Sequence, residues 1–246
     1  MDRPDISIVI PVFNEEKRVA AALDDVLGYF KKRRDSWEAV FVDDGSADGT
    51  LDILWCARER GAPLRLVSLG RNRGKGEAIR MGVLASRGKY VLFRDADASV
   101  AMEEFERVRP FIAEGAPVII GSRRVPGAAV VTRQAWRREF AGRCFTRLCR
   151  LLLAREVRDY TCGFKCFSRE AADEIFSRQR LKRWAFDAEI LFLAGKLGYP
   201  IVQVPVVWRD CAGTKVRVLR DAASSFVELG MLMAFRALGL YRPRGT

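Results

Sequence analysis

The chain has 246 residues, which suits one large α/β domain, and its 49% hydrophobic and 30% charged residues are typical of a globular protein. The formal net charge of +12 predicts an anionic partner: nucleic acid, a lipid surface or a phosphorylated substrate. The sequence has no histidine, which excludes Ser-His-Asp and Cys-His nucleophile systems and histidine-bearing zinc sites. The six cysteines form no C-x-x-C pair and indicate small buried residues in a reducing compartment.

Strand patterns alternate with helical patterns through the first half of the chain. Residues 6–13 form a near-continuous apolar run, which is typical of a parallel strand covered on both faces. Asn14 then opens a helix, and further strands are expected at residues 39–46, at residues 64–69 and from Lys89 onward. The alternation predicts an α/β fold with a single Rossmann-like, doubly wound and mostly parallel sheet flanked by helices.

The strand that begins at Lys89 ends in the sequence RDADAS, in which one alanine separates Asp95 from Asp97. Because side chains alternate along an extended backbone, we expect both carboxylates to point the same way. Two adjacent hard oxygen ligands at the carboxyl end of a strand suit a divalent cation that also takes phosphate oxygens. A solvated acidic turn is the alternative, and the D-x-D pattern alone does not decide between the two.

Two familiar phosphate-binding motifs are missing from the sequence. The turn after the first strand, PVFNE, lacks the G-x-G-x-x-G of dinucleotide-binding folds. Residues 70–76 contain Gly-Lys without the Walker spacing or a following Ser or Thr. Neither a dehydrogenase nor a P-loop enzyme is therefore supported.

The second half of the chain is predicted to contain helices at 102–113, 134–154, 184–197 and from about 216, strands at 117–122 and 201–208, and a Gly/Pro-containing loop at 125–132. Arg143, Arg147 and Arg150 share one face of the helix at 134–154; such faces are either solvated or lie on lipid headgroups. The last helix is apolar nearly all round from Leu229 to Leu240.

The longest uncharged run is about half the roughly 20 residues that a bilayer span needs, so we expect no transmembrane segment. We also expect no signal peptide, since a strand pattern begins almost at the N-terminus.

Six segments in a fixed order resemble the family 2 glycosyltransferases of the A-type fold, and among these the polyprenyl-phosphate hexose synthases. They are IPVFNEE, VDDGSADGT, RNRGKGEAIRMGVLASRGKYVLFRDADAS, GSR, VRDYTCGFKCFSREAA and RWAFDAEIL. Each segment is weak alone, but together they span residues 6 to about 215. The resemblance implies a catalytic nucleotide-sugar transferase domain at 1–215, with residues 216–246 as an amphipathic helix of the same domain.

On the donor side, the resemblance implies a nucleotide site made from two strand ends. Pro11, Asn14 and Glu15 correspond to the loop that holds the nucleotide. Asp43 or Asp44 corresponds to the residue that contacts the base. Strand ends of a doubly wound sheet are where such ligands bind.

The resemblance also implies a cation, Mg²⁺ or Mn²⁺, beside the donor phosphates. Asp95 and Asp97 match the metal-binding pair, and Lys75 matches a basic loop over the nucleotide. Some relatives carry Gln where this chain has Ser99, so a third metal ligand is not expected from that position.

On the acceptor side, the GSR segment places Ser122 in the substrate site and matches Arg123 to an arginine near the phosphates. Arg138 resembles an arginine that faces the acceptor phosphate, and Asp159 belongs to the acceptor-side loop. Asp187 lies in the first turn of a predicted helix, where it either orients the acceptor or satisfies the helix dipole.

The function implied is inverting, metal-dependent transfer of a hexose, with glucose from UDP-glucose favoured, onto dolichyl or undecaprenyl phosphate. A phosphate acceptor is already anionic and needs no strong base, which is consistent with a site that lacks histidine.

A GDP-mannose-dependent synthase is the alternative within this class. A non-catalytic module for anionic lipid or nucleic acid is the alternative from another class, but acidic pairs at strand ends would repel a nucleic-acid backbone. We expect no nucleic-acid partner and a peripheral position on the cytoplasmic face of a membrane. Besides membrane contact, the alternatives for the last helix are packing on its own domain and a homodimer contact.

Overall fold

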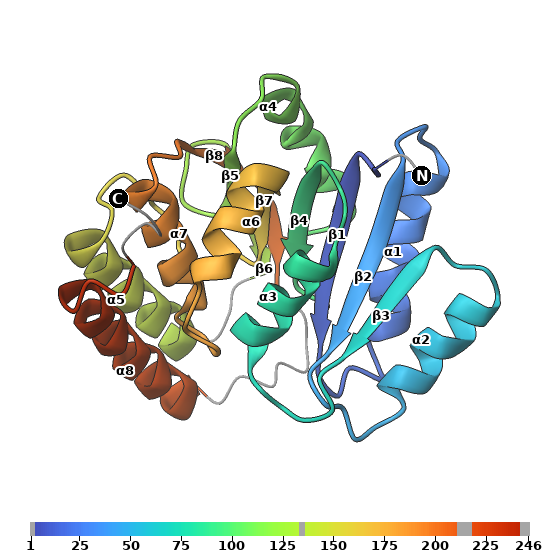
Figure 1. Cartoon of the computed structure of the whole chain (residues 1–246), viewed down its shortest axis with the longest axis horizontal. Coiled ribbons are helices and arrows are strands. Elements are labelled where there is room, and N and C mark those ends of the chain that lie inside the picture. The colour runs from blue at the N-terminus through green and yellow to red at the C-terminus, as the bar shows by residue number, and fades with distance from the viewer. Residues whose placement is uncertain (1–2, 133–135, 211–217, 242–246) are drawn as a thin grey trace.

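A seven-stranded sheet runs through the molecule, with its strands in the order β3-β2-β1-β4-β7-β5-β8 (Figure 1). The structure is a computed structural model and describes residues 3–132, 136–210 and 218–241. The strands of this sheet are β1 (Ile6–Val12), β2 (Trp37–Asp43), β3 (Leu64–Ser68), β4 (Tyr90–Arg94), β5 (Val118–Ser122), β7 (Phe164–Ser168) and β8 (Ile201–Pro205). Only β7 runs antiparallel to its neighbours, β4 and β5. The predicted α/β fold with a mostly parallel sheet is confirmed.

Alternate strand residues supply two separate cores, one on each face of the sheet. In β1, Ile8 and Ile10 belong to one apolar cluster and Val9 to the other. The first cluster contains α1 (Val19–Lys31), α2 (Thr50–Glu59) and the 3-10 helix η1 (Met102–Arg107). The other contains α3 (Lys75–Ala85), α5 (Trp136–Leu152), α6 (Arg169–Arg178), α7 (Phe186–Lys196) and α8 (Val218–Ala237). Both faces are thus covered, as the apolar strand of residues 6–13 predicts.

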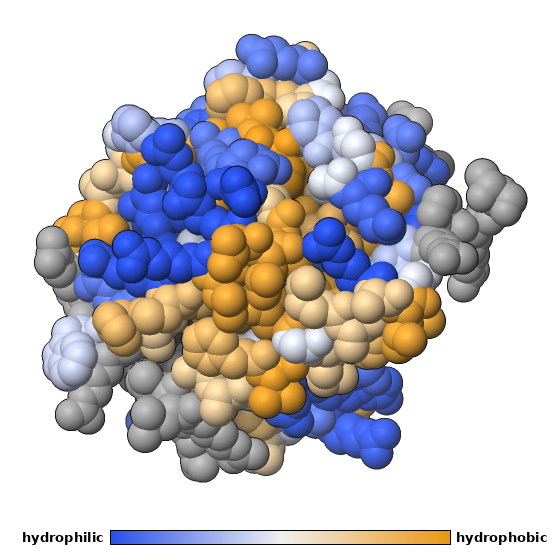
Figure 2. Space-filling model, turned by 90° about the vertical axis from the view of Figure 1, so that its left-hand side faces the viewer, coloured by the Kyte–Doolittle hydropathy of each residue, from blue (hydrophilic) through white to orange (hydrophobic). Residues whose placement is uncertain are grey.

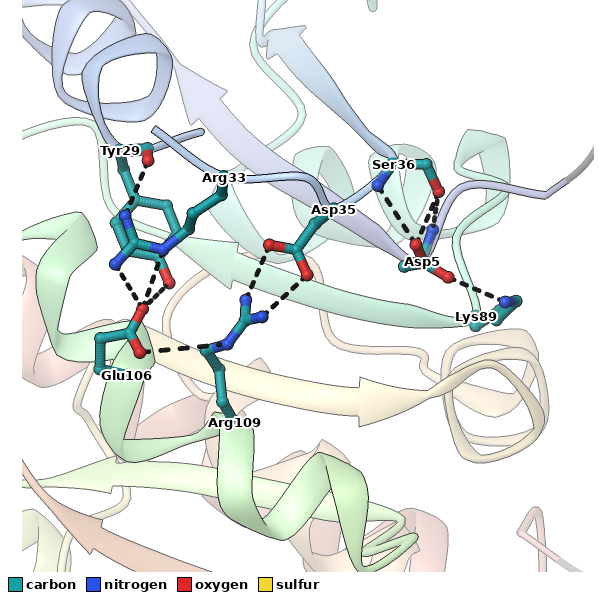
Figure 3. A network of polar contacts seen from close by, with 8 residues as sticks. All are labelled: Asp5, Tyr29, Arg33, Asp35, Ser36, Lys89, Glu106 and Arg109. Carbon is teal, nitrogen blue, oxygen red and sulfur yellow. Dashed lines mark hydrogen bonds and ion pairs between the residues drawn. The ribbon is translucent and has the colours of Figure 1, made fainter. Parts of the chain in front are cut away.

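Polar contacts tie the amino-terminal ends of the strands together (Figure 3). Asp5 precedes β1 and binds Ser36 before β2 and Lys89 before β4. The hydrogen bond from Lys89, together with those from Ser36, lowers the pKa of Asp5 to about 2. Arg109, in α4 (Arg109–Ala113), binds both oxygens of Asp35 at 2.9 and 3.0 Å. This edge is occupied by structural contacts, which leaves the opposite, carboxyl edge for a binding site.

Three predicted elements are divided in the structure. The strand from Lys89 ends at Arg94, so Asp95 and Asp97 lie in a turn and the expected strand alternation between them is wrong. The helix at 102–113 is η1 followed by α4, with Pro110 in the first turn of the latter. The strand at 201–208 is β8 followed by β9 (Val207–Arg209), which pairs in a second sheet.

Three other expectations were incomplete. The loop predicted at 125–132 contains β6 (Ala129–Thr132), which pairs in parallel with β9. The helix expected from Asn14 begins at Val19, because Asn14 has φ of 54° and turns the chain. β7 and α6 were not predicted; the residues of β7 follow the TCG segment, whose glycine and polar residues resemble a loop.

Among the described residues, no helix combines the length and apolar composition that crossing a bilayer requires.

Gly82 of α3 packs closely against the sheet, and this contact allows a stability prediction. A Cβ at this position would lie 2.4 Å from Val9 Cγ1 and 2.7 Å from Val42 Cγ2. Gly82→Ala should therefore lower the free energy of unfolding by about 1–3 kcal/mol through overpacking, as measured by urea denaturation. Gly28→Ala in α1 is the matched control, since a Cβ there meets nothing within 4 Å. The control should be neutral or stabilising by up to about 1 kcal/mol; equal stability of both variants would contradict the packing.

Candidate active site

The turn after β4 holds Asp95 in a close contact with β7. The Asp95 N–H donates to Gly163 O at 3.1 Å. A Cβ on Gly163 would lie 2.2 Å from Asp95 Oδ2, so this carboxylate occupies the space that any side chain at 163 would need. On its other side, Lys75 Nζ lies 2.6 Å from Asp95 Oδ1.

Asp97 accepts hydrogen bonds from within the same turn. Its Oδ1 accepts from Ser99 N at 3.0 Å and from Ser99 Oγ at 2.7 Å, and Ala98 has φ of 52°. Ser99 thus orients Asp97. The two carboxylates are neighbours because the chain turns, and not because a strand alternates.

Lys75 is the positive centre of an acidic cluster. Burial alone would lower the pKa of its ammonium, but the nearby carboxylates of Asp95, Asp187 and Asp97 raise it. Lys75 is therefore charged and balances carboxylates that would otherwise repel one another. Its ammonium also lies 5.8 Å from the centre of the Trp184 ring.

Arg123 and Asp159 form a buried ion pair at the end of β5. Arg123 Nε and Nη2 lie 2.8 Å from the two carboxylate oxygens, and Arg123 N donates to the same carboxylate at 3.0 Å. Arg123 Nη2 also donates to Thr161 Oγ1 at 2.8 Å. Burial would raise the pKa of Asp159, whose side chain is fully buried, but the guanidinium holds it well below its usual range.

The residues expected to hold the nucleotide organise two neighbouring loops. Asn14 and Glu15 bind the loop after β2: Asn14 Oδ1 accepts from Ala47 N at 2.7 Å and Glu15 N donates to Thr50 Oγ1 at 2.7 Å. Asp43 accepts from the N–H groups of Gly45 and Ser46 in that same loop, at 3.2 and 3.0 Å.

Asp44 holds the loop before α3. Its two oxygens accept from Arg73 N at 2.6 Å and Gly74 N at 2.9 Å. Burial raises the pKa of this carboxyl, although those two N–H groups oppose the rise. Asp44 thus connects the β2 end to the loop that carries Lys75.

The remaining predicted residues differ in their surroundings. Pro11 lies within β1 and Ser122 is buried at the end of β5. Arg138 lies in α5, but its side chain is outside the described residues. Asp187 is buried and paired at 2.5 Å with Lys165 Nζ. Burial raises the pKa of Asp187, while Lys165 and Lys75 oppose the rise.

Lys165 and Gly163 were not recognised from the sequence as site residues. Besides Asp187, Lys165 Nζ binds the carbonyls of Tyr160 at 3.0 Å and Cys162 at 2.7 Å, and it is fully buried. The sequence did contain a signal for Lys165, because it is a single lysine within the apolar run FKCF. A lysine buried in such a run requires a partner.

A cationic hollow of about 430 Å³ lies beside this edge, lined by Arg124, Phe140, Arg143, Cys144 and Arg147. Arg143, Cys144 and Arg147 lie three, four and seven positions after Phe140, so the four residues share one helix face. Among the described residues, no carboxylate pairs with Arg124 or Arg147, whereas Arg143 binds Glu139 at 2.5 Å. Burial lowers the pKa of the Arg124 guanidinium, and repulsion from Arg123 and Arg143 lowers it further. The Asp159 carboxylate opposes this shift.

Asp95 and Asp97 fit a small divalent cation by donor chemistry, since carboxylate oxygens are the ligands that Mg²⁺ and Mn²⁺ prefer. Within the described part of the chain, no group of three acidic or cysteine side chains converges on one point. The two carboxylates alone leave coordination positions open, which suits a cation that also takes diphosphate oxygens.

The contribution of the Arg123–Asp159 pair to the free energy of unfolding should depend on pH. Asp159→Asn leaves the buried guanidinium unpaired and should lower the free energy of unfolding at pH 7 by about 3–5 kcal/mol. Because folding depresses the pKa of Asp159, the stability it adds is present above the unfolded pKa of about 4 and is lost as pH falls below it.

Urea denaturation across pH should therefore show a constant gap between wild type and variant above about pH 5, which narrows on acidification. Asp35→Asn is the control: it breaks the more exposed pair with Arg109, 36% exposed, and should cost about 1 kcal/mol or less. A similar loss in the two variants would contradict the importance of the Arg123–Asp159 pair.

Comparisons with known proteins identify relatives of this chain. Residues 7–176 match the model of Glycosyl transferase family 2. The dolichyl-phosphate β-glucosyltransferase of Mus musculus is 36% identical over 224 residues, which are 86% of this chain and 69% of that protein. The dolichyl-phosphate β-glucosyltransferase of Dictyostelium discoideum is 34% identical over 236 residues, 91% of this chain and 71% of that protein.

A solved structure supports the fold. Glucosyl-3-phosphoglycerate synthase from Mycobacterium tuberculosis, in complex with Mn²⁺, UDP-glucose and phosphoglyceric acid, aligns with a TM-score of 0.70 at 22% identity over 93% of this chain and 79% of that one. The expected family and fold are confirmed. The chain is a glycosyltransferase that belongs to family 2, and over most of its length it is similar to the dolichyl-phosphate β-glucosyltransferases.

Proposed function

We propose that this chain is an inverting, metal-dependent glucosyltransferase that moves glucose from UDP-glucose to a polyprenyl phosphate. The observation that carries the proposal is that the D-x-D turn, Lys75 and the Arg123–Asp159 pair meet at the carboxyl edge of the sheet. The similarity to dolichyl-phosphate β-glucosyltransferases supports the choice of donor and acceptor. We assign the catalytic domain to residues 1–215 and count residues 216–246, which include α8, as part of the same domain.

On the donor side, the loops held by Asn14, Glu15, Asp43 and Asp44 bind the nucleoside, beside Pro11. Asp95 and Asp97 hold Mg²⁺ or Mn²⁺, which when bound supplies charge stabilisation to the leaving diphosphate. Lys75 is tethered to Asp95 and adds a fixed positive charge on the same side.

On the acceptor side, the phosphate monoester is already ionised and attacks the anomeric carbon directly, with inversion. No residue has to remove a proton, which suits a chain without histidine. Arg123, with Ser122 beside it, contributes positive charge near the phosphates, and Asp159 fixes its orientation. Asp187 acts through Lys165, whose ammonium holds the carbonyls of the acceptor-side loop.

We assign the acceptor phosphate to the cationic hollow on α5, the helix that also carries Arg138. Arg124 and Arg147 lack carboxylate partners among the described residues, so a dianionic phosphate would compensate them. Exposed apolar side chains on the same helix, Trp136 at 71% and Phe140 at 63% exposure, suit the start of a hydrocarbon chain.

A lipid acceptor also implies a membrane surface, and we place the protein peripherally on its cytoplasmic face. Figure 2 looks onto the side that carries α5 and α8 and shows a hydrophobic area bordered by hydrophilic residues. Exposed apolar side chains of α8 include Val227 and Met231. Basic residues near anionic lipid gain about 1 kcal/mol each, so reversible binding is expected.

The first test concerns the metal pair and the donor. Asp97→Asn should lower kcat about a hundredfold, because loss of about 3 kcal/mol of charge stabilisation corresponds to that factor. Calorimetric titration with MnCl₂ and UDP should show weaker metal binding in the variant. Asp52→Asn, an exposed carboxylate on α2, is the control and should behave as wild type.

The same assay separates the alternatives for the donor. Inhibition of UDP-glucose turnover should be stronger with UDP than with GDP; tighter inhibition by GDP would favour a GDP-mannose-dependent synthase. Full activity and unchanged metal affinity in Asp97→Asn would rule out the metal assignment. A wild type that binds anionic vesicles but no nucleotide sugar would favour the non-catalytic lipid module.

The second test concerns the hollow. Arg147→Gln should raise the KM for a water-soluble short-chain polyprenyl phosphate about tenfold, since one charge-assisted contact is worth about 1.5 kcal/mol. Arg150→Gln, one turn away in α5 and outside the hollow, should leave that KM unchanged. Equal KM values in the two variants would indicate that the acceptor phosphate binds outside the hollow. Co-sedimentation with anionic vesicles measures surface binding separately, and we expect it to weaken in both variants.

A further inference from the structure

Segment 180–185, between α6 and α7, is held by two buried glutamates. Glu228 of α8 accepts from the N–H groups of Arg183 at 3.2 Å, Trp184 at 2.9 Å and Ala185 at 2.9 Å. Glu189 accepts from the N–H groups of Arg180 at 2.9 Å and Leu181 at 2.8 Å. Ala185 cannot cap α7 with its own side chain, so Glu228 satisfies the N–H groups before this helix from outside it.

The carbonyls of the same segment face the start of α3. Lys182 O accepts from Glu77 N at 3.0 Å, and Arg183 O accepts from Gly76 N at 3.2 Å. α3 has no side-chain cap of its own, so the segment satisfies its first N–H groups. The approach is close: a Cβ on Gly74 would lie 2.4 Å from Lys182 O.

The start of α3 is also where the donor side of the site is anchored. Lys75 is the first residue of α3 and reaches Asp95 at 2.6 Å. The two residues before it, Arg73 and Gly74, donate their N–H groups to Asp44. A shift of segment 180–185 would therefore move Lys75 and release Asp44.

We infer that Glu228 is a positioning residue for the donor site, acting through segment 180–185 on the N-terminus of α3 and on Lys75. Glu228 is remote from the D-x-D turn in sequence and belongs to a helix outside the segments that resemble the family. The same helix packs on α5, where the Phe226 and Phe145 rings lie 5.9 Å apart. α8 thus contacts both the segment behind the donor loop and the helix that lines the cationic hollow. The inference rests on the proposed function for the identity of the donor.

The variant Glu228→Gln keeps the shape but removes the charge that three N–H groups share. We expect the Kd for UDP-glucose in the presence of MnCl₂, measured by calorimetry, to rise about tenfold. In turnover, the KM for UDP-glucose should rise by the same factor while the KM for the short-chain polyprenyl phosphate stays within about twofold.

Glu38→Gln is the matched control. Glu38 is also 8% exposed and accepts from a backbone N–H, that of Arg87 at 2.6 Å, as well as from Ser7 Oγ at 2.7 Å. It follows the start of β2, at the amino edge of the sheet, so its loss should lower stability without changing the Kd for UDP-glucose.

Amide hydrogen exchange supplies a readout that does not depend on the donor. In Glu228→Gln, the N–H groups of Gly76 and Glu77 should exchange faster than in wild type, whereas Glu38→Gln should leave them unchanged. Unchanged exchange together with an unchanged Kd would overturn the inference. Faster exchange in a protein whose wild type does not bind UDP-glucose would instead refute the proposed donor. If Glu228→Gln does not fold, Glu228→Asp, which keeps the charge on a shorter side chain, is measured in the same two ways.

Discussion

The arrangement of the site depends on the position of Asp95 between Lys75 and Gly163. One carboxylate oxygen meets the ammonium of Lys75, and the other lies where a Cβ of residue 163 would be. Gly163 precedes β7, the one antiparallel strand in the seven-stranded sheet, so this contact exists only because β7 is inserted between β4 and β5. The preceding residue, Arg94, is fully buried and bound to Asp25 of α1, which also accepts from Met102 N at 3.1 Å. The turn that carries the acidic pair is thereby fixed on both sides.

Charges inside the site are balanced in pairs. Lys75 faces Asp95, Arg123 faces Asp159, and Lys165 faces Asp187. A buried charge without a partner is costly, so each pair makes the burial of its members tolerable and orients them at the same time. Such fixed charges need little reorganisation when charge develops on a substrate, which is the property that favours catalysis in a protein site. Among the residues that the structure describes, positive charge without a carboxylate partner lies outside these pairs, in the hollow lined by Arg124 and Arg147.

The two edges of the sheet have different roles. At the amino edge, Asp5 connects strand ends to one another, while Asp35 and Glu106 bind arginines of neighbouring segments (Figure 3). At the carboxyl edge, carboxylates bind backbone N–H groups of loops: Asp43 in the loop after β2, Asp44 in the loop before α3, and Glu228 and Glu189 in segment 180–185. Backbone N–H groups held in this way leave the loops ordered without filling them with side chains, and ordered loops at strand ends are where α/β proteins bind ligands.

The sequence by itself determined the sheet architecture and the family. Apolar runs such as residues 6–13 leave few alternatives to a strand buried on both faces. The order of the six motifs is specific, and the first four of them lie at the carboxyl ends of strands. It also indicated the acidic pair, since charged residues after a buried strand lie at one edge of the sheet. Lys75 and Arg123 were indicated only by the resemblance of their segments to the family. Only the tertiary structure decided how they are arranged. The strand alternation expected for Asp95 and Asp97 was wrong, because Ala98 at φ of 52° and the Ser99 bonds turn the chain there. The partners of Arg123, Asp187 and Glu228 lie 36, 22 and 43–45 residues away, and periodicity within one element carries no information about such contacts.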